Sequence, residues 1–280
     1  MRTVLRTLTE KLRLLPGVCV QRLPTSSALT RARQRLGAKP LQILFERRCG
    51  TLATTATSGA FAFGLRLVAW DGTALDVPDT NANAREFGFT GKGGANQSGH
   101  PQVRLMALTE CGTHALVDAA FDAVATFSEQ RLARQLLASL RPDMLLLTDR
   151  NFSGYELWGL ARATGAHLAW RIKKNLVFVP LRVLPDGSYL SVMPTPKETV
   201  RHGQARAAGR RLAKPPQGHT VRVIQYAVTV GPRVGLPHTE TFRLVTSLLD
   251  HRLALTRAPR PAPKACTTCS STVGWPGRPV

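Results

Sequence analysis

The feature that most constrains this chain is a pair of apolar segments that each run into an aspartate. Leu65–Trp70 alternates and then becomes continuously apolar before Asp71, and Met144–Thr148 is apolar up to Asp149. Runs of this kind predict buried β-strands, and the glycine after Asp71 predicts a turn or a close approach to the backbone at that point. A carboxylate at the end of a buried strand is costly unless a metal ion, an arginine or several backbone donors pair with it.

The two aspartates come together if their strands are neighbours in one sheet. Two carboxylates a few ångströms apart repel each other unless a cation lies between them. Mg²⁺, or Mn²⁺ in its place, suits such oxygen ligands, and two ions of this kind can clamp the attacking and leaving oxygens of a phosphoryl transfer. A second ion needs a third carboxylate. The alternative is that each aspartate only caps the element that follows it.

The basic excess of the chain indicates a polyanionic partner. Its 280 residues include 38 Lys and Arg against 17 Asp and Glu, a formal net charge of +21, and residues 151–280 hold 19 of the basic and 5 of the acidic residues. A field of this sign favours nucleic acid. The alternative is a GC-rich coding sequence, which also drifts towards arginine. The 5 scattered cysteines favour a reducing cytoplasm, and no apolar run reaches the roughly 18–20 residues of a membrane span.

Hydrophobic periodicity and turn residues divide the chain into four regions. Residues 1–50 have the apolar spacing of short helices, and residues 51–174 alternate strands and helices around the two aspartates. Residues 175–249 have the pattern of short strands and turns, whereas residues 250–280 lack periodicity and are expected to be disordered. The expected helices are 1–15, 25–36, 40–49, 128–140 and 153–163, the expected core strands are 65–71, 102–109, 114–121, 144–148 and 167–172, and the expected loops are 80–100 and 197–218.

Basic residues in three places are candidates for DNA contact: the N-terminal helices, the segments that follow Asp149 and the strand at 167–172, and the basic loop. Contacts of this kind bind phosphates and position the protein without specifying a sequence. The alternative is a solvated basic surface. The candidates are Arg31, Arg33, Arg35, Arg150, Lys173, Lys174, Arg201, Arg206, Arg210, Arg211 and Lys214.

A series of segments, in order along the chain, resembles bacterial insertion-sequence transposases of the DDE type, the Insertion Sequence Four family. The segments are SALTRARQRLG, LVAWDGTALDVPDTNANAREFG, PQVRLMALTECGTHALVDA, LLLTDRNFSGYELW, ATGAHLAWRIKKN, LPDGSYLS and FRLVTSLLD. They span the chain from about Leu5 to Asp250. Two aspartate motifs in this order, each with these neighbours, are highly specific.

The resemblance implies an α/β fold with an RNase H-like mixed-sheet core, a short helical N-terminal module and a β-rich insertion. The implied parts are a helical module at 1–50, the catalytic core at 51–174, the insertion with the last core strand at 175–249, and a tail at 250–280. Asp71 matches the first catalytic aspartate and Asp149 the second, both Mg²⁺ ligands, and Arg150 matches the arginine that commonly follows the second. The implied partners are DNA, as transposon inverted-repeat ends and as target, and a second copy of the chain on that DNA. The implied location is the bacterial cytoplasm, at the nucleoid.

One departure from the family bears on activity. The family's catalytic glutamate lies in a Tyr-Arg-Glu-Lys signature on a helix after the strand that matches FRLVTSLLD, and here no Asp or Glu follows Asp250. We expect a frameshift or premature end just beyond Leu253. The expected function is therefore that of a transposase-derived protein for DNA binding and Mg²⁺-dependent strand cleavage and transfer whose catalytic glutamate is missing. The alternative is a catalytically inactive DNA-binding remnant or an inhibitor of intact transposase.

Overall fold

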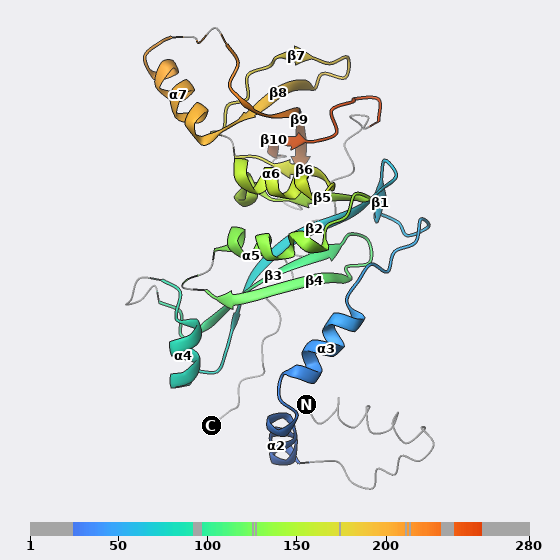
Figure 1. The fold of residues 1–280 in the computed structure, drawn as a ribbon, viewed down its shortest axis with the longest axis vertical. Helices are drawn as coiled ribbons and strands as arrows, with labels where there is room; N and C mark the ends of the chain where they lie inside the picture. The colour runs from blue at the N-terminus through green and yellow to red at the C-terminus, as the bar shows by residue number, and fades with distance from the viewer. Residues whose placement is uncertain are drawn as a thin grey trace. The chain divides into compact units, whose positions relative to one another are not determined.

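The computed structural model of the chain (Figure 1) describes residues 25–91, 97–124, 126, 128–173, 175–210, 212, 214–230 and 238–253. Residues 1–49 and 50–280 form two separate compact units. The helix expected at 1–15 and the tail expected to be disordered at 254–280 lie outside the described residues. No helix within the described ranges is long and apolar enough to cross a membrane.

The N-terminal unit contains two short helices, α2 (Ser26–Leu36) and α3 (Lys39–Arg48), as predicted. The side chain of Thr25 accepts a hydrogen bond from the Ala28 backbone N–H and so caps α2, and Gly37, with a φ of 69°, ends it. Neither helix has a buried residue.

The second unit is built on one mixed sheet. Its strand order is β4-β3-β2-β5-β6-β10-β9-β8-β7, and β1 pairs with β2. Strands β2, β5 and β6 run parallel to one another, whereas all other neighbouring strands are antiparallel. The parallel strands are central, as the α/β prediction of an RNase H-like core requires. The strands are β1 (Phe61–Ala62), β2 (Leu65–Asp76), β3 (Gln102–Glu110), β4 (Leu116–Ala123), β5 (Met144–Thr148), β6 (His167–Arg171), β7 (Arg182–Val183), β8 (Tyr189–Pro194), β9 (Gly218–Val230) and β10 (His238–Thr246).

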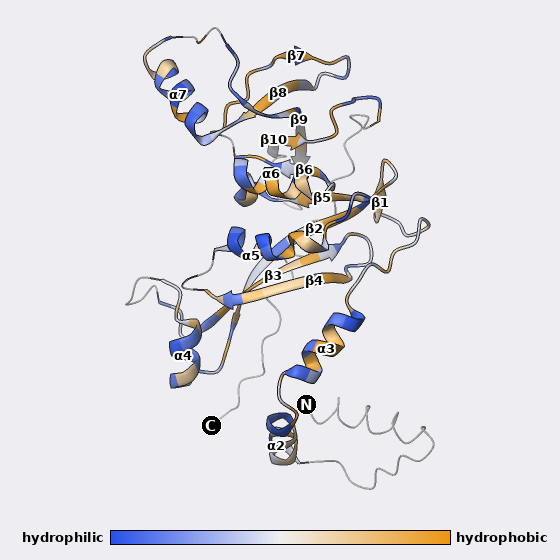
Figure 2. Cartoon of the chain, viewed as in Figure 1, coloured by the Kyte–Doolittle hydropathy of each residue, from blue (hydrophilic) through white to orange (hydrophobic). Residues whose placement is uncertain are grey.

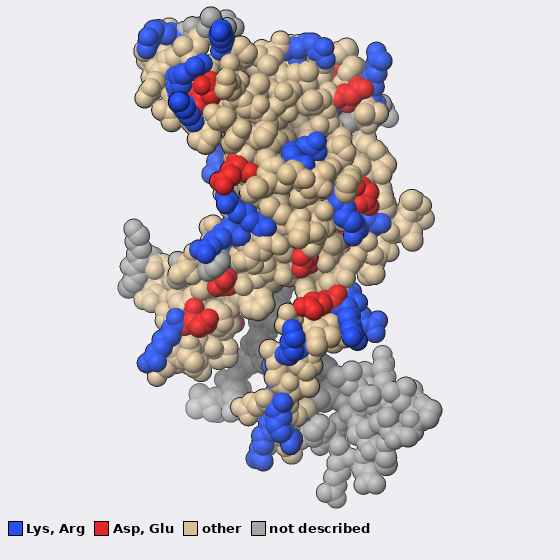
Figure 3. All heavy atoms as spheres, viewed as in Figure 1, with Lys and Arg blue, Asp and Glu red and all other residues tan. Residues whose placement is uncertain are grey.

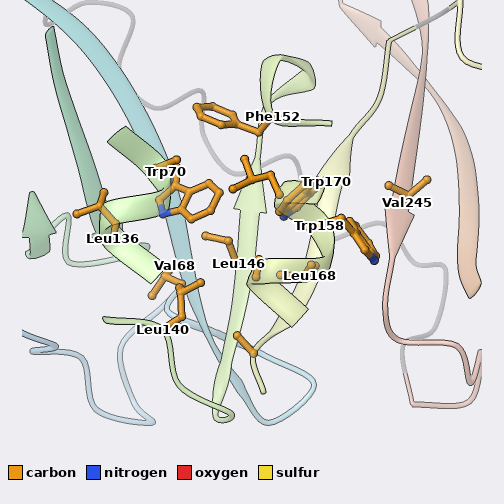
Figure 4. Close-up of a cluster of buried hydrophobic side chains, with 14 of the residues drawn as sticks. Val68, Trp70, Leu136, Leu140, Leu146, Phe152, Trp158, Leu168, Trp170 and Val245 are labelled. Atoms are coloured by element: carbon orange, nitrogen blue, oxygen red, sulfur yellow. The ribbon is translucent and has the colours of Figure 1, made fainter. Parts of the chain in front are cut away.

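The core lies between this sheet and the helices that follow β4 and β5. These are α5 (Glu129–Gln135), its continuation η2 (Leu136–Ser139), and α6 (Tyr155–Ala163), which the short turn η3 (Arg150–Phe152) precedes. Figure 2 shows apolar residues on the strands of the sheet and on part of α6. Figure 4 shows Val68, Leu136, Leu146, Trp158 and Leu168 in one cluster, and all five are fully or almost fully buried.

Three sequence expectations were wrong. β2 does not end at Asp71, because its antiparallel pairing with β3 continues to Asp76 opposite Gln102. Of the two alternatives for Gly72, the turn is therefore wrong, whereas the approach is close, since a Cβ there would lie 3.0 Å from the Met106 side chain. The stretch 80–100 contains a helix, α4 (Asn81–Phe87), capped by Thr80. Much of the expected basic loop is also a helix, α7 (Pro196–Ala207). Thr195 caps α7 and Pro196 opens it, and this local chemistry outweighs its single internal glycine.

The turn between β3 and β4 offers a stability prediction at Gly112. This glycine has a φ of 86°, and a Cβ there would lie 2.7 Å from the Ser58 carbonyl oxygen and 2.9 Å from the Ala60 backbone nitrogen. We expect Gly112→Ala to lower the free energy of unfolding by about 1–3 kcal/mol, through backbone strain and the clash. Gly203→Ala in α7 is the matched control, because a Cβ there meets nothing within 4 Å. Urea unfolding should show no loss in the control, and an equal loss in both variants would contradict the prediction.

Candidate metal centre

Strand register places Asp71, Asp149 and Arg171 side by side. β2 and β5 pair in parallel up to Ala69 opposite Leu147, and continuing that register by two residues brings Asp71 opposite Asp149. β5 and β6 pair up to Thr148 opposite Trp170, and one further step brings Asp149 opposite Arg171. Neighbouring strands lie about 4.8 Å apart, so two such carboxylates are within reach of one cation.

The three residues share a face of the sheet because side chains alternate along a strand. Trp70 and Trp170, each immediately before a member of the row, are buried on the face that α5 and α6 cover. Asp71, Asp149 and Arg171 therefore point to the opposite face. Asp71 is exposed, and the side chains of Asp149 and Arg171 are 53% and 33% exposed.

An aromatic cluster lies beneath this row of charges. The ring of Trp70 is 5.6 Å from that of Phe152 and 6.1 Å from that of Trp170, and Trp158 meets Trp170 edge-on at 5.0 Å. Figure 4 shows these four aromatic side chains together. Large rings packed at such distances fix the backbone of β2, β6 and the segment after Asp149. The charged side chains consequently project from rigid elements.

Capping does not explain either aspartate. Asp149 precedes η3, yet its side chain makes no capping hydrogen bond, and Asp71 lies in the middle of β2. One Oδ1 atom of Asp149 lies 3.7 Å from Nη1 of Arg171. The sequence allowed a metal ion, an arginine or backbone donors as the partner of each aspartate. In the structure an arginine faces Asp149. The Asp71 side chain has no hydrogen bond or ion pair with any described residue, although its backbone pairs with β3.

The donor set suits one hard divalent ion. Two carboxylates on neighbouring strands, facing the same side and accessible to solvent, supply the oxygen ligands that Mg²⁺ prefers. No group of three or more His, Cys, Asp or Glu side chains that could hold a metal occurs in the described part of the chain. A third carboxylate of the kind that a second ion needs is therefore not supplied by those residues.

The basic candidates fall into separate groups. Arg31, Arg33 and Arg35 are exposed on α2, in the N-terminal unit. Arg150 and Lys173 are exposed directly after β5 and β6, close in sequence to the row. Lys174 and Arg211 lie outside the described residues. Arg201 is on α7 and pairs with Glu198 at 3.2 Å.

Arg206, Arg210 and Lys214 surround a hollow beside α7. Its volume is about 990 Å³, and its walls are mainly apolar, with Phe178 and Met193 among them. Figure 3 shows Lys and Arg atoms gathered over the region of α7. The structure therefore brings these three predicted DNA-contact residues together. Arg201, although it is also on α7, does not line the hollow.

Sequence reasoning missed Arg171 and the tryptophans as part of this site. A signal was present, because β2 contains Ala-Trp-Asp and β6 contains Ala-Trp-Arg, the same buried pair followed by a charge. Only the parallel register of β2, β5 and β6 shows that the two charges belong to one row.

Comparison with known proteins gives two family matches and close relatives. Residues 1–46 match the family described as insertion element 4 transposase N-terminal, and residues 62–246 match the transposase DDE domain. The transposase InsG for insertion sequence element IS4 of Escherichia coli K12 is 32% identical over 171 residues, which cover 60% of this chain and 38% of InsG. The putative transposase InsZ of the same organism is 31% identical over 150 residues, covering 51% of this chain and 48% of InsZ. The matches thus span less than half the length of each relative.

Proposed function

Because this chain belongs to the DDE transposases of the insertion sequence 4 family, we propose that it binds DNA and holds a divalent metal ion between Asp71 and Asp149. The observation that carries the proposal is the strand register, which aligns the two carboxylates on one face of the sheet. A bound Mg²⁺ or Mn²⁺ would polarise a phosphodiester and activate the attacking oxygen. The parent reaction is strand cleavage and transfer in DNA transposition.

The residues of this chain contribute binding and orientation to that chemistry. Asp71 and Asp149 supply oxygen ligands from strands that the aromatic cluster holds rigid, which favours a fixed geometry at the reacting phosphate. Arg150 and Lys173 follow the carboxyl ends of the parallel strands β5 and β6, so they lie beyond the same end of the row and would bind phosphates next to it. The basic residues around α7 and those on α2 would also contact DNA phosphates, without reading the base sequence. The inverted-repeat ends, the target DNA and a homodimer on that DNA remain predictions.

A second candidate function is DNA binding without cleavage. The observation that favours it is that residues 251–280, where the family resemblance implies the third carboxylate, contain no Asp or Glu. Loss of one ligand from a two-metal site should remove several kcal/mol of transition-state stabilisation. We therefore propose that this chain alone cleaves DNA at or below the detection limit. It could then act as a remnant or as an inhibitor of intact transposase.

Metal titration tests the proposed site directly. We expect Mn²⁺ to bind the full chain, as followed by electron paramagnetic resonance, and Asp71→Asn or Asp149→Asn to weaken binding by at least roughly tenfold. Glu129→Gln is the matched control, because its carboxylate lies 3.3 Å from where a Gly72 Cβ would be, on the opposite face of β2. Equal Mn²⁺ binding by wild type and both aspartate variants would contradict the proposal.

A nicking assay separates the two candidate functions. The substrate is a supercoiled plasmid that carries the DNA flanking the gene, incubated with Mg²⁺ or Mn²⁺. We expect retardation of this DNA on a gel without nicking. Metal-dependent nicking that Asp71→Asn abolishes would show instead that the chain is active without a carboxylate after Asp250.

A further inference from the structure

Arg171 lies between two carboxylates that come from different parts of the second unit. Its Nη1 atom is 3.7 Å from Oδ1 of Asp149, at the end of β5, and its Nη2 atom is 3.6 Å from Oε1 of Glu240, on β10. The guanidinium also covers the ring of Phe242, with its Cζ 4.4 Å from the ring centroid. One arginine therefore links the proposed metal ligand to a strand of the β-rich insertion.

Register places all of these groups on the same face of the sheet. Arg171 pairs with Leu244 of β10, so Phe242 and Glu240, at even spacing from Leu244, project to the side of Arg171. Glu240 comes from the part of β10 that extends beyond the end of β6. It thus approaches Arg171 from the side away from Asp149.

The two contacts leave the guanidinium free to shift between its carboxylates. Both distances exceed the 2.7–3.2 Å of a direct hydrogen bond, so charge attraction rather than fixed bonds holds the group between them. The side chains are partly exposed, at 33% for Arg171 and 35% for Glu240. Stacking on Phe242 keeps the guanidinium plane near both acids while it moves.

We propose that Arg171 and Glu240 are positioning residues that set the metal affinity of Asp149. Without a divalent ion, the guanidinium neutralises Asp149. When an ion binds Asp149, the two cations repel each other, and Arg171 moves towards Glu240, which becomes its counterion. Glu240 thus allows the metal to compete for Asp149, and the insertion tunes the metal site through one arginine. This inference rests on the proposed metal site at Asp71 and Asp149.

Mn²⁺ affinities of a small set of full-length variants test the inference. Arg171→Met removes the competing cation and should tighten Mn²⁺ binding by roughly tenfold, whereas Glu240→Gln leaves Arg171 with Asp149 alone and should weaken binding by a similar factor. Arg171→Lys should stay close to wild type, because it keeps the charge. Glu156→Gln, an exposed carboxylate that pairs with Arg134 on α5, is the control and should change nothing.

The double variant Arg171→Met/Glu240→Gln identifies the route of the effect. Because Glu240 acts only through Arg171, the double variant should bind Mn²⁺ as tightly as Arg171→Met alone. If Glu240→Gln weakens binding equally in both backgrounds, Glu240 attracts the metal directly and the inference is wrong. Thermal unfolding of each variant without metal confirms that the fold is kept, a readout that a purely structural role would move.

The outcomes also separate this inference from the proposed function. If Mn²⁺ binding is lost in Asp149→Asn but Arg171→Met and Glu240→Gln bind like wild type, only the role of Arg171 and Glu240 is overturned. If wild type itself binds no Mn²⁺, or binds it equally without Asp149, both proposals fail together.

Discussion

Glu110→Ala is expected to lower the free energy of unfolding by about 3–5 kcal/mol, the usual cost of removing one partner from a buried ion pair. Glu110 is fully buried at the end of β3 and pairs with Arg66. Its Oε2 atom also accepts hydrogen bonds from the backbone N–H groups of Leu52 and Ala53, at 3.0 and 2.7 Å, and from the Thr113 hydroxyl at 2.6 Å. Truncation leaves all four donors without this acceptor.

This carboxylate joins segments that are distant in sequence, which is why its loss should unfold the chain cooperatively. It ties the connector at 52–53 and the first part of β2 to the turn after β3. Urea unfolding followed by circular dichroism measures the effect. Glu156→Ala, whose ion pair with Arg134 is exposed, is the control and should change stability by less than about 0.5 kcal/mol. A loss below about 1 kcal/mol for Glu110→Ala would contradict the structure of this cluster.

The same carboxyl group predicts a pH dependence. Burial raises the pKa of Glu110, but the hydrogen bonds from Thr113, from the Ala53 and Leu52 backbone and from Arg66 outweigh it, so the folded-state pKa lies below the ordinary value of 4.5. A group with a depressed folded pKa contributes stability above its unfolded pKa and loses it as pH falls through the folded pKa. The difference between wild type and Glu110→Ala should therefore be full at pH 7 and shrink below about pH 4.5.

The parts of the fold that the sequence predicted are those that local chemistry determines. β5 has the predicted bounds, and the caps at Thr25 and Ser128 begin helices where expected, because an apolar run or an N-cap acts within a few residues. β2 was predicted too short. Its last five residues are partly or fully exposed, so hydrophobicity gave no sign of them, and pairing with β3 rather than burial extends the strand.

The two aspartates of the candidate site could be proposed from sequence because each follows an apolar strand. The sequence alone could not predict that the two side chains lie on the same face of the sheet, since only the register between β2 and β5 determines this. The contact between Arg171 and Glu240 is still harder to predict from the sequence. Their meeting depends on the antiparallel pairing of β6 with β10, which brings residues about 70 positions apart in sequence to one another. Nothing local in either segment marks such a contact.

This dependence on long-range pairing has a consequence for the function. Strands β7 to β10 belong to the same sheet as β2, β5 and β6, since β10 pairs with β6 along one edge and with β9 along the other. A distortion of β9 or of the turns that hold it is therefore transmitted to β10, and so to Glu240 and Phe242 beside Arg171. The stability of β7 to β10 and the geometry of the proposed metal site should therefore vary together.

Arg222→Ala, within this part of the sheet, is expected to cost about 3–5 kcal/mol of stability. Arg222 lies on β9 and is fully buried, yet its guanidinium pairs with Asp186. Its Nε atom donates to the Ser188 hydroxyl at 2.7 Å, and its Nη1 atom reaches the Asp250 carbonyl oxygen at 3.5 Å. The side chain thus joins β9 to the β7–β8 turn and to the segment after β10. Its removal leaves a cavity and the Asp186 carboxylate, 9% exposed, without its cation.

A double-mutant cycle distinguishes the ion pair from simple packing. Arg222→Met alone and Asp186→Leu alone should each cost about as much as Arg222→Ala, because each leaves one buried charge without its partner. Arg222→Met/Asp186→Leu keeps much of the volume and removes both charges, so it should lie within about 1–2 kcal/mol of wild type. If the double variant is instead as unstable as the sum of the single variants, packing rather than the paired charge holds the turn. Urea unfolding gives the free energies of unfolding of all these variants. The Mn²⁺ affinity of the double variant then shows whether the proposed metal site keeps its geometry when the ion pair at this turn is replaced by apolar side chains.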